Sequence, residues 1–407
     1  MRFFAFFLIF TSVIGIAHFY VGRRLVSSSP LTKSRRRIGW MLVGLSFVLS
    51  ASPMLILIFL RGTFSSEPLA WIGFIAMGFF SVLTVLTAGR DIVYLFMRMV
   101  EGLGRLFKRL ISRADATDPK VDASRRKMLI AGSNLAVIGL SGVLTGYGVI
   151  EARRRPRILP VEVPLPNLPP QFDGFKIVQI SDLHVGPTIK RNWVEMVGQV
   201  ADDAGGDLVV LTGDLVDGTV PQLREDTAPL RDLSARFGRY FVTGNHDYYS
   251  GVMPWLEEID RLGWGVLLNQ HRVIEKDGAQ LVIAGVTDLT AAGHIADQRS
   301  SPQGAIAGAP VGAVRILLAH QPKSVVEASA AGFDLQLSGH THGGQFFPWD
   351  NFARLAQPYL SGLHRHDNMW IYVSRGTGYW GPPVRIGQPS EITLITLRRG
   401  AIQTGRG

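Results

Sequence analysis

The stretch LSGHTHGGQ, residues 337–345, places two histidines one residue apart between glycines, directly after the apolar run FDLQL. Residues i and i+2 of an extended segment point to the same side, so His340 and His342 can direct their rings at one place. An isolated His-x-His is equally compatible with a purely structural role. The rest of the chain therefore has to show whether these two rings share a ligand.

Four more apolar runs end at polar residues that can bind a metal or transfer a proton. They are FKIVQISDLHVG with Asp182 and His184, GDLVVLTGDLVDG with Asp214, RYFVTGNHDYYS with Asn245, His246 and Asp247, and VRILLAHQP with His320. Continuous apolar runs of about four to eight residues are typical of buried strands. Helix-like stretches at 193–204, 227–237 and 253–262 alternate with them, which predicts sheets covered by helices. Ligands of such folds gather at the carboxyl ends of strands, so five coincidences favour one shared site.

The net charge of +10 is unevenly distributed along the chain. Residues 1–157 carry +15 and the remaining residues carry −5. A nucleic-acid-binding protein would need a basic patch on a folded domain, and the C-terminal part is mildly acidic, so we exclude that class of partner. The chain has no cysteine, which excludes disulfides, thiolate metal ligands and a cysteine nucleophile.

Long apolar runs occupy most of the first 150 residues. There are four, at 3–20, 38–60, 69–88 and 128–150. Each is close to the roughly 20 residues that a helix needs to cross a bilayer. Four such runs argue against buried helices of a soluble domain, so we predict a transmembrane region over 1–157 and a separate domain over 158–407.

Basic residues predict the orientation of this region. They concentrate in 23–37 and 90–127, whereas 61–68 contains only Arg61. The positive-inside rule places the first two segments, as loops, in the cytoplasm. The fourth run then leads outward, although four arginines within 153–157 oppose this. We therefore expect a multi-pass inner-membrane protein with its C-terminal domain on the extracytoplasmic side.

The segment SRRKMLIAG, residues 124–132, resembles a twin-arginine export signal. Paired arginines before a membrane helix are also common as topology anchors, and both interpretations stay open. No small-x-small cleavage site is evident, so we expect an anchor rather than a removed peptide.

The ordered motifs D-x-H, G-D, G-N-H-D, isolated H and G-H-x-H resemble the calcineurin-like metallophosphoesterase superfamily over roughly 172–397. The tail SRGTGYWGPPVRIGQPSEITLITL and the apolar N-terminus resemble a bacterial membrane-associated subgroup. The resemblance implies an α+β fold, a layered αββα sandwich over 158–407, preceded by about four transmembrane helices.

The resemblance also implies a role for each motif residue. One metal ion would be held by Asp182, His184 and His342, the other by Asn245, His320 and His340, and Asp214 would bridge them together with a solvent hydroxide. The ions would be divalent or of mixed valence, namely Mn, Zn or Fe, because imidazole, carboxylate and amide oxygen suit them. His246 would donate a proton to the leaving oxygen. Asp247 would either orient the His246 ring or cap the following turn.

These features predict a membrane-anchored, metal-dependent phosphoric ester hydrolase acting on a phosphodiester, a phosphomonoester or a pyrophosphate. Anchoring favours a lipid-linked substrate, of which UDP-diacylglucosamine is one candidate from the resembled subgroup. The alternative is a non-catalytic metal-bound scaffold or regulatory module, which the presence of Asp182 and His246 disfavours. A transporter or sensor is disfavoured because the apolar runs contain almost no charge.

Several polar residues keep open assignments. Arg375 and Arg385 flank GTGYWGPPV and would either contact phosphate or be solvated loop residues. His364 and His366 form a second His-x-His outside the motifs. The sequence does not indicate an oligomeric state.

Overall fold

The computed structural model describes residues 2–59, 66–111 and 123–400. The chain divides into two compact units, Met1–Tyr147 and Gly148–Gly407. The sequence suggested a division at residue 157. The unit boundary lies earlier because the last turn of a long helix, residues 148–152, belongs to the second unit.

The first unit is helical. Its elements are α1 (Arg2–Gly22), the π-helical turn η1 (Arg23–Ser27), α2 (Lys33–Phe59), α3 (Ser66–Ile111) and most of α4 (Ala123–Ala152). Within the described residues, three helices are long and apolar enough to cross a membrane: Lys33–Leu55, Glu67–Phe107 and Ser124–Ala152. The expected number of about four is therefore corrected to three. The run 3–20 is helical, but the side chains of its first residues lie outside the described part.

The α3 helix continues well beyond the expected apolar run. Residues 90–111, predicted as part of a basic loop, extend it to Ile111. This stretch contains no proline, and its apolar residues recur at helical spacing, which favours continuation of the helix. Residues 112–122 of the predicted loop lie outside the described residues.

Polar contacts join the helices of this unit near the basic residues. The hydroxyl of Tyr20 donates to Asp91 over 2.6 Å, and the Arg24 guanidinium pairs with the same carboxylate at 2.6 Å. The amide of Asn134 donates to Ser29 over 2.7 Å. These contacts tie α1, η1, α3 and α4 together where the charge is concentrated.

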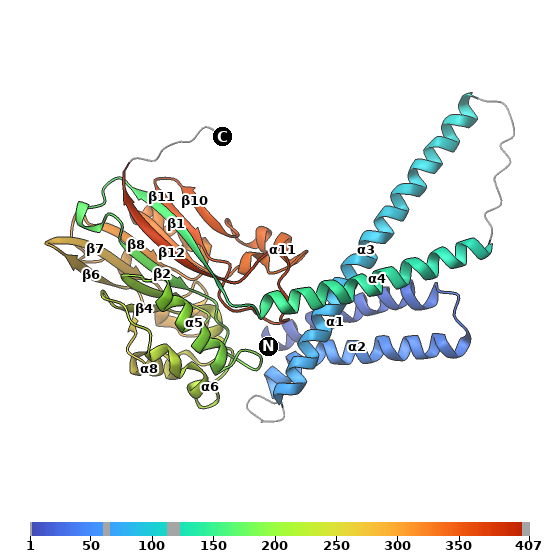
Figure 1. Cartoon of the computed structure of the whole chain (residues 1–407), viewed down its shortest axis with the longest axis horizontal. Coiled ribbons are helices and arrows are strands. Elements are labelled where there is room, and N and C mark those ends of the chain that lie inside the picture. The colour runs from blue at the N-terminus through green and yellow to red at the C-terminus, as the bar shows by residue number, and fades with distance from the viewer. Residues whose placement is uncertain (1, 60–65, 112–122, 401–407) are drawn as a thin grey trace. The chain divides into compact units, whose positions relative to one another are not determined.

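The second unit contains two six-stranded sheets (Figure 1). The first has the order β1 (Arg157–Leu165), β12 (Glu391–Arg399), β2 (Lys176–Ile180), β3 (Leu208–Thr212), β4 (Arg239–Val242), β5 (Gly265–Val266). The second has the order β10 (Gly362–His366), β11 (Met369–Val373), β9 (Leu335–Ser338), β8 (Val314–Leu318), β7 (Ala279–Gly285), β6 (Gln270–Lys276). Strands β2 to β5 are mutually parallel, as are β7, β8, β9 and β11.

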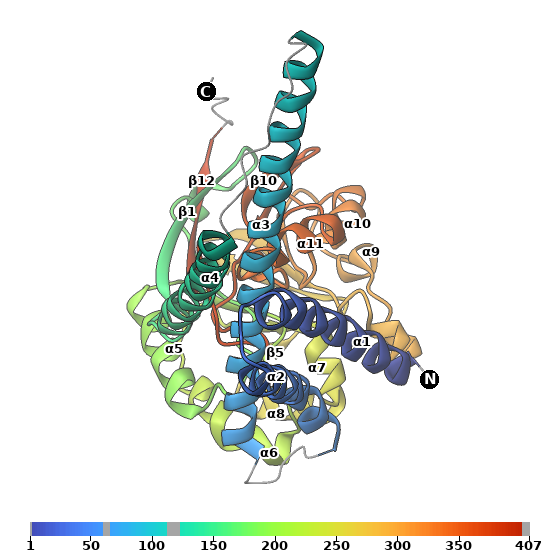
Figure 2. The ribbon, with the colours of Figure 1, turned by 90° about the vertical axis from the view of Figure 1, so that its right-hand side faces the viewer.

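Helices cover both outer faces of the sheets. The first sheet is covered by α5 (Arg191–Asp203), α6 (Val220–Thr227) and α8 (Val252–Arg261), and the second by α9 (Pro302–Ala305) and α10 (Val325–Ala330). Figure 2 shows these two groups on opposite sides of the unit. Ile177 and Val210 of one sheet and Ile316 and Leu337 of the other share the core between the sheets. The predicted αββα sandwich is thereby confirmed.

The remaining short elements lie in the connections. They are α7 (Asn245–Tyr249), α11 (Trp349–Ala356), and the 3-10 turns η2 (Pro170–Phe172), η3 (Ala228–Arg231), η4 (Ala291–Gly293), η5 (Ala296–Gln298), η6 (Pro322–Ser324) and η7 (His342–Gly344). The predicted helix at 227–237 is met only by the 3-10 turn η3 at Ala228–Arg231. The helix lies earlier, over Val220–Thr227, where Thr219 and Gln222 form a capping box that fixes its start.

The five predicted strands are β2, β3, β4, β8 and β9. A buried side chain links the two sheets where these strands end. The amide of Gln179, on β2, donates to Thr212 Oγ1 and to the carbonyl of Ser338, each over 2.9 Å. The carboxyl ends of β2, β3 and β9 are therefore held together, and the motif loops start from this edge.

Candidate metal centre

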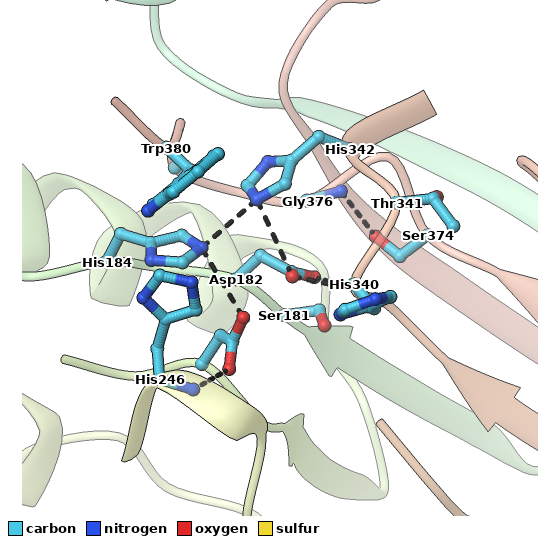
Figure 3. A network of polar contacts seen from close by, with 12 residues as sticks. Ser181, Asp182, His184, His246, His340, Thr341, His342, Ser374, Gly376 and Trp380 are labelled. Carbon is cyan, nitrogen blue, oxygen red and sulfur yellow. Dashed lines mark hydrogen bonds and ion pairs between the residues drawn. The ribbon is translucent and has the colours of Figure 1, made fainter. Parts of the chain in front are cut away.

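The first group of candidate ligands is Asp182, His184 and His342 (Figure 3). The Nε2 atoms of the two histidines lie 3.1 Å apart. His342 Nε2 lies 3.7 Å from Asp182 Oδ1. All three side chains are buried. Two imidazole nitrogens and one carboxylate oxygen thus converge on one point.

The second group is Asp214, His320 and His340. His320 Nε2 lies 3.1 Å from Asp214 Oδ2 and 3.2 Å from His340 Nδ1. The same Asp214 oxygen lies 3.7 Å from His184 Nε2, in the first group. One oxygen of Asp214 therefore lies near histidines of both groups, a geometry that favours the predicted bridging role.

Asn245, the further ligand that the sequence predicts for the second group, is the first residue of α7. Its side-chain oxygen is buried and has no hydrogen-bond partner within the part of the chain that the structure describes. An unsatisfied buried carbonyl is unfavourable unless another group neutralises it, and a metal ion does so. The ligand role of Asn245 stays a prediction, and its buried oxygen favours it.

Hydrogen bonds at Nδ1 of two candidate histidine ligands leave the Nε2 lone pair available to a metal ion. His320 Nδ1 donates to the carbonyl of Thr212 over 2.8 Å, and His184 Nδ1 donates to Asp217 Oδ2 over 3.0 Å. In a neutral imidazole the other nitrogen then has a free lone pair. Both Nε2 atoms point into the cluster, and such an outer hydrogen bond is the usual support of a metal-binding histidine. The donor set therefore fits metal ions.

Most of the candidate ligands have a left-handed backbone. The φ angles of Asp182, His184, Asp214, His340 and His342 lie between 51° and 74°. A residue with a side chain pays about 1–3 kcal/mol for such a conformation, and these residues cluster at functional sites. The surrounding bonds hold the strain: the amide of His340, for example, donates to both oxygens of Asp182, at 2.9 and 3.1 Å.

His246 lies beside the cluster and is oriented by Asp217. Its Nδ1 lies 2.6 Å from Asp217 Oδ1, and its backbone amide donates to Asp214 Oδ1 over 2.9 Å. The other oxygen of Asp217 accepts from His184. One carboxylate therefore fixes two rings. The close pairing of Val185 with Val216 brings the two loops together.

The orienting role proposed for Asp247 is corrected by these contacts. Its carboxylate accepts the backbone amides of Gly244, Asp214 and Leu215, at 2.8, 3.1 and 2.9 Å. The carboxylate of Asp247 thus bonds the turn before α7 and the loop after β3, and not the turn that follows it, which was the predicted alternative. Asp217 takes the orienting position. The spacing of three residues in Asp214-Leu-Val-Asp217 was the available signal, but sequence alone did not place that carboxylate beside His246.

Charges in the site shift the titration of its histidines. Burial lowers the pKa of His246, but the carboxylates of Asp217 and Asp214 outweigh burial and raise that pKa to about 9. Burial also lowers the pKa of His320, and Asp214 raises it to about 10. Burial and the neighbouring His320 lower the pKa of His340 to about 3. The carboxylates of Asp214 and Asp217 therefore favour the charged forms of His320 and His246.

Comparison with known proteins agrees with this geometry. Residues 175–344 match the calcineurin-like phosphoesterase family. A bovine transmembrane protein with metallophosphoesterase domain is 34% identical over 95% of this chain and 87% of its own length. A zebrafish protein of the same description is 35% identical over 78% of this chain and 74% of its own length. An uncharacterized metallophosphoesterase of Helicobacter pylori is 36% identical over 67% of this chain and 72% of its own length.

This chain belongs to the calcineurin-like phosphoesterase family. The predicted resemblance and the predicted enzyme class, a metal-dependent phosphoric ester hydrolase, are thereby confirmed. The family uses divalent metal ions, and a phosphate ester is the implied substrate class. The relatives' names and the three apolar helices indicate a membrane protein.

Arg375 and Arg385, the two arginines that flank GTGYWGPPV, are not solvated loop residues. Arg385 is fully buried, and its guanidinium donates to the carbonyls of Arg375, Gln388 and Gly378, at 2.8, 2.9 and 3.1 Å. Its Nη2 also lies 3.1 Å from His342 Nδ1. Arg375 pairs with Glu391 at 3.0 Å. Arg385 therefore supports the loop next to a ligand.

The second His-x-His lies on β10, and both of its histidines bond to residues just before this strand. His364 Nε2 lies 2.7 Å from the carbonyl of Ser361, and His366 Nδ1 lies 3.1 Å from the hydroxyl of Tyr359. Neither belongs to the metal-binding groups found among the described residues. These contacts favour a structural role for both.

Two half-exposed aromatic side chains border His246 in the phosphoesterase. The rings of Tyr249 and Trp380 have their centroids 5.2 and 5.4 Å from that of His246. Trp380 stands next to His184 and His246 in Figure 3. The side chain of His246 is itself 15% exposed. A substrate can therefore reach the imidazole past these two rings.

Proposed function

We propose that this chain is a multi-pass, membrane-anchored phosphoesterase of the inner membrane that works with two metal ions and uses His246 as general acid. One observation carries the proposal: Asp214 lies between two groups of ligand atoms, and His246, held by Asp217, stands beside them. Asp182, His184 and His342 would hold one ion, and Asn245, His320 and His340 the other, with Asp214 shared. When bound, such ions would neutralise phosphoryl oxygens and activate water.

The protein residues contribute positioning and a proton. Asp217 accepts from Nδ1 of His246, which keeps the ring fixed and favours its protonated form. A protonated imidazole next to the cluster can donate to the leaving oxygen of a phosphate ester, and a positioned acid contributes about 10² to 10⁴ in rate. Asp247 contributes indirectly, because it holds the backbone of Asp214 and Gly244 in place.

The substrate class follows from chemistry and location. The site suits a phosphodiester, a phosphomonoester or a pyrophosphate, and a domain joined to membrane helices meets lipid-linked phosphates at high local concentration. UDP-diacylglucosamine is one such compound to be tested. A non-catalytic scaffold is the second candidate, and the partly exposed His246 beside the ligand groups argues against it.

The decisive experiment is a hydrolysis assay of the full chain in nanodiscs, first stripped of metal and then loaded with Mn, Zn or Fe. Substrates are an alkyl phosphodiester, a nitrophenyl phosphodiester, a phosphomonoester, and the lipid pyrophosphate UDP-diacylglucosamine. We expect metal-dependent turnover of at least one of them. Two bound ions per chain without turnover of any substrate would favour the scaffold.

A His246→Gln variant tests the acid directly. It should retain metal, and turnover of the alkyl diester should fall by about 10² to 10⁴. The nitrophenyl ester should lose much less, because its leaving group is stable as an anion. Equal losses on both esters would indicate that His246 stabilises phosphoryl charge instead, and loss of metal would make it a ligand.

A further inference from the structure

The short helix α11 turns apolar side chains away from the domain. Trp349 and Phe352 are 50% and 59% exposed, and Leu355 is 85% exposed. Phe347, just before the helix, is 60% exposed. We call these four side chains the α11 face. They form one continuous surface, since the rings of Trp349 and Phe352 are 5.8 Å apart and the helical residues follow each other at intervals of three.

The opposite side of α11 faces the domain, and it carries a charged and a small side chain instead of large apolar ones. Asp350 and Ala353 are only partly exposed, and Asp350 lies against Gly344. A surface helix in water normally buries its apolar stripe and exposes its polar one. A cluster of exposed aromatic and aliphatic side chains marks a surface that another body covers.

The α11 face is connected to the point where the membrane helix enters the domain. The candidate span Ser124–Ala152 ends inside the second unit, which begins at Gly148. The carbonyl of Gly148 accepts the amide of Arg385 over 3.0 Å, and the next amide, of Ile386, donates to Gln345 over 3.0 Å. Gln345 lies two residues before Phe347. A short series of backbone contacts thus joins the end of α4 to the α11 face.

We propose that the α11 face inserts into the interfacial layer of the bilayer that α4 crosses. Amphipathic helices with tryptophan, phenylalanine and leucine on one side lie in the plane of that layer. Tryptophan is enriched there because its ring is amphipathic. The second unit begins at Gly148, inside α4 and its candidate span, so only a short stretch of chain separates the α11 face from the membrane helix.

The contact also fixes the orientation of the metal centre. The amide of Gln345 donates to the carbonyl of His342, and the amide of Trp349 to that of Phe346, each over 3.0 Å. The loop that carries His342 therefore continues directly into the α11 face. This inference does not rest on the proposed function, because lipid contact is measured without any hydrolysis.

The absence of cysteine makes a labelling experiment simple. Phe352→Cys and Leu355→Cys are each labelled with a polarity-sensitive fluorophore in the full chain, reconstituted at one chain per nanodisc. Val311→Cys is the matched control, because Val311 is 99% exposed in the same unit. Quenching is measured with a nitroxide-bearing lipid and with aqueous iodide.

We expect blue-shifted emission at positions 352 and 355, strong quenching by the nitroxide lipid and protection from iodide, with the opposite behaviour at 311. Iodide quenching at 352 and 355 equal to that at 311 would overturn the proposal. Protection seen only in vesicles with many chains, and absent in single-chain discs, would also overturn it, because a second copy would then cover the face. Melting curves with the parent midpoint confirm that the variants fold.

Discussion

At the scale of single residues, the candidate ligands combine side chains that suit a metal ion with an unfavourable backbone conformation. Five of them have positive φ angles, and each such residue is strained on its own. Bonds such as those from the amide of His340 to Asp182 support this geometry. The motifs in the sequence named the residues of the first two candidate groups, since residue type and order carry that information. They did not name Asp217, which forms a third candidate group with His184 and His246.

The first prediction concerns Asp214. Asp214→Asn should lower the bound metal and abolish hydrolysis, because its Oδ2 lies between the two ligand groups and a neutral amide attracts cations less. Elemental analysis of the purified protein measures the metal. Asp334→Asn is the control, because Asp334 bonds the amide of Arg315 away from the site and should retain metal. Two ions per chain with normal turnover in Asp214→Asn would rule out the shared-ligand role.

The second prediction separates Asp217 from Asp247. A general acid must be protonated, so activity falls as the pH rises through the pKa of His246. Asp217 raises that pKa, so Asp217→Asn should shift the alkaline limb of kcat/KM to lower pH. Asp247→Asn should lower stability and leave the alkaline limb in place, since the hydrogen bonds of Asp247 to the described residues go to backbone amides. A full pH profile of kcat/KM for both variants checks this. A shift of the alkaline limb in Asp247→Asn alone would mean that Asp247, and not Asp217, orients His246.

At the scale of elements, apolar runs predicted the strands well because burial on both faces leaves a simple pattern. The helix predicted near 227–237 was misplaced because helix caps and turns depend on single residues such as Thr219. Asp217 was missed for a related reason. Its place beside His246 depends on how the β3 loop pairs with the β2 loop, a contact between residues distant in sequence. Periodicity does not contain that information.

The third prediction tests how closely the loops after β3 and β4 approach each other. A Cβ on Gly244 would overlap the Asp214 carboxylate and its backbone nitrogen. Gly244→Ala should therefore lose metal and activity while the domain still folds. Gly198→Ala is the matched control, because nothing lies near that position in α5, and alanine there should raise the melting temperature slightly. A folded Gly244→Ala with full metal content would show that the loops can move apart.

At the scale of the whole molecule, the side of the membrane on which the catalytic unit lies does not depend on α1. The helix α2 starts from the basic residues 33–37, α3 returns to the basic residues 90–109, and α4 follows. Correcting the number of spans from four to three therefore leaves the predicted placement unchanged. The four arginines within 153–157 are the opposing signal, and the ten basic residues within 90–127 outnumber them.

The fourth prediction resolves that opposition with two single cysteines. Val311→Cys lies on an exposed loop of the catalytic unit, and Ser34→Cys lies among the basic residues that begin α2. Positive-inside topology predicts that a membrane-impermeant maleimide modifies Val311→Cys in intact spheroplasts. Ser34→Cys should react only after lysis, which controls for spheroplast integrity. The reverse pattern would place the catalytic unit in the cytoplasm, and it would mean that the arginines after α4 outweigh the ten basic residues before it.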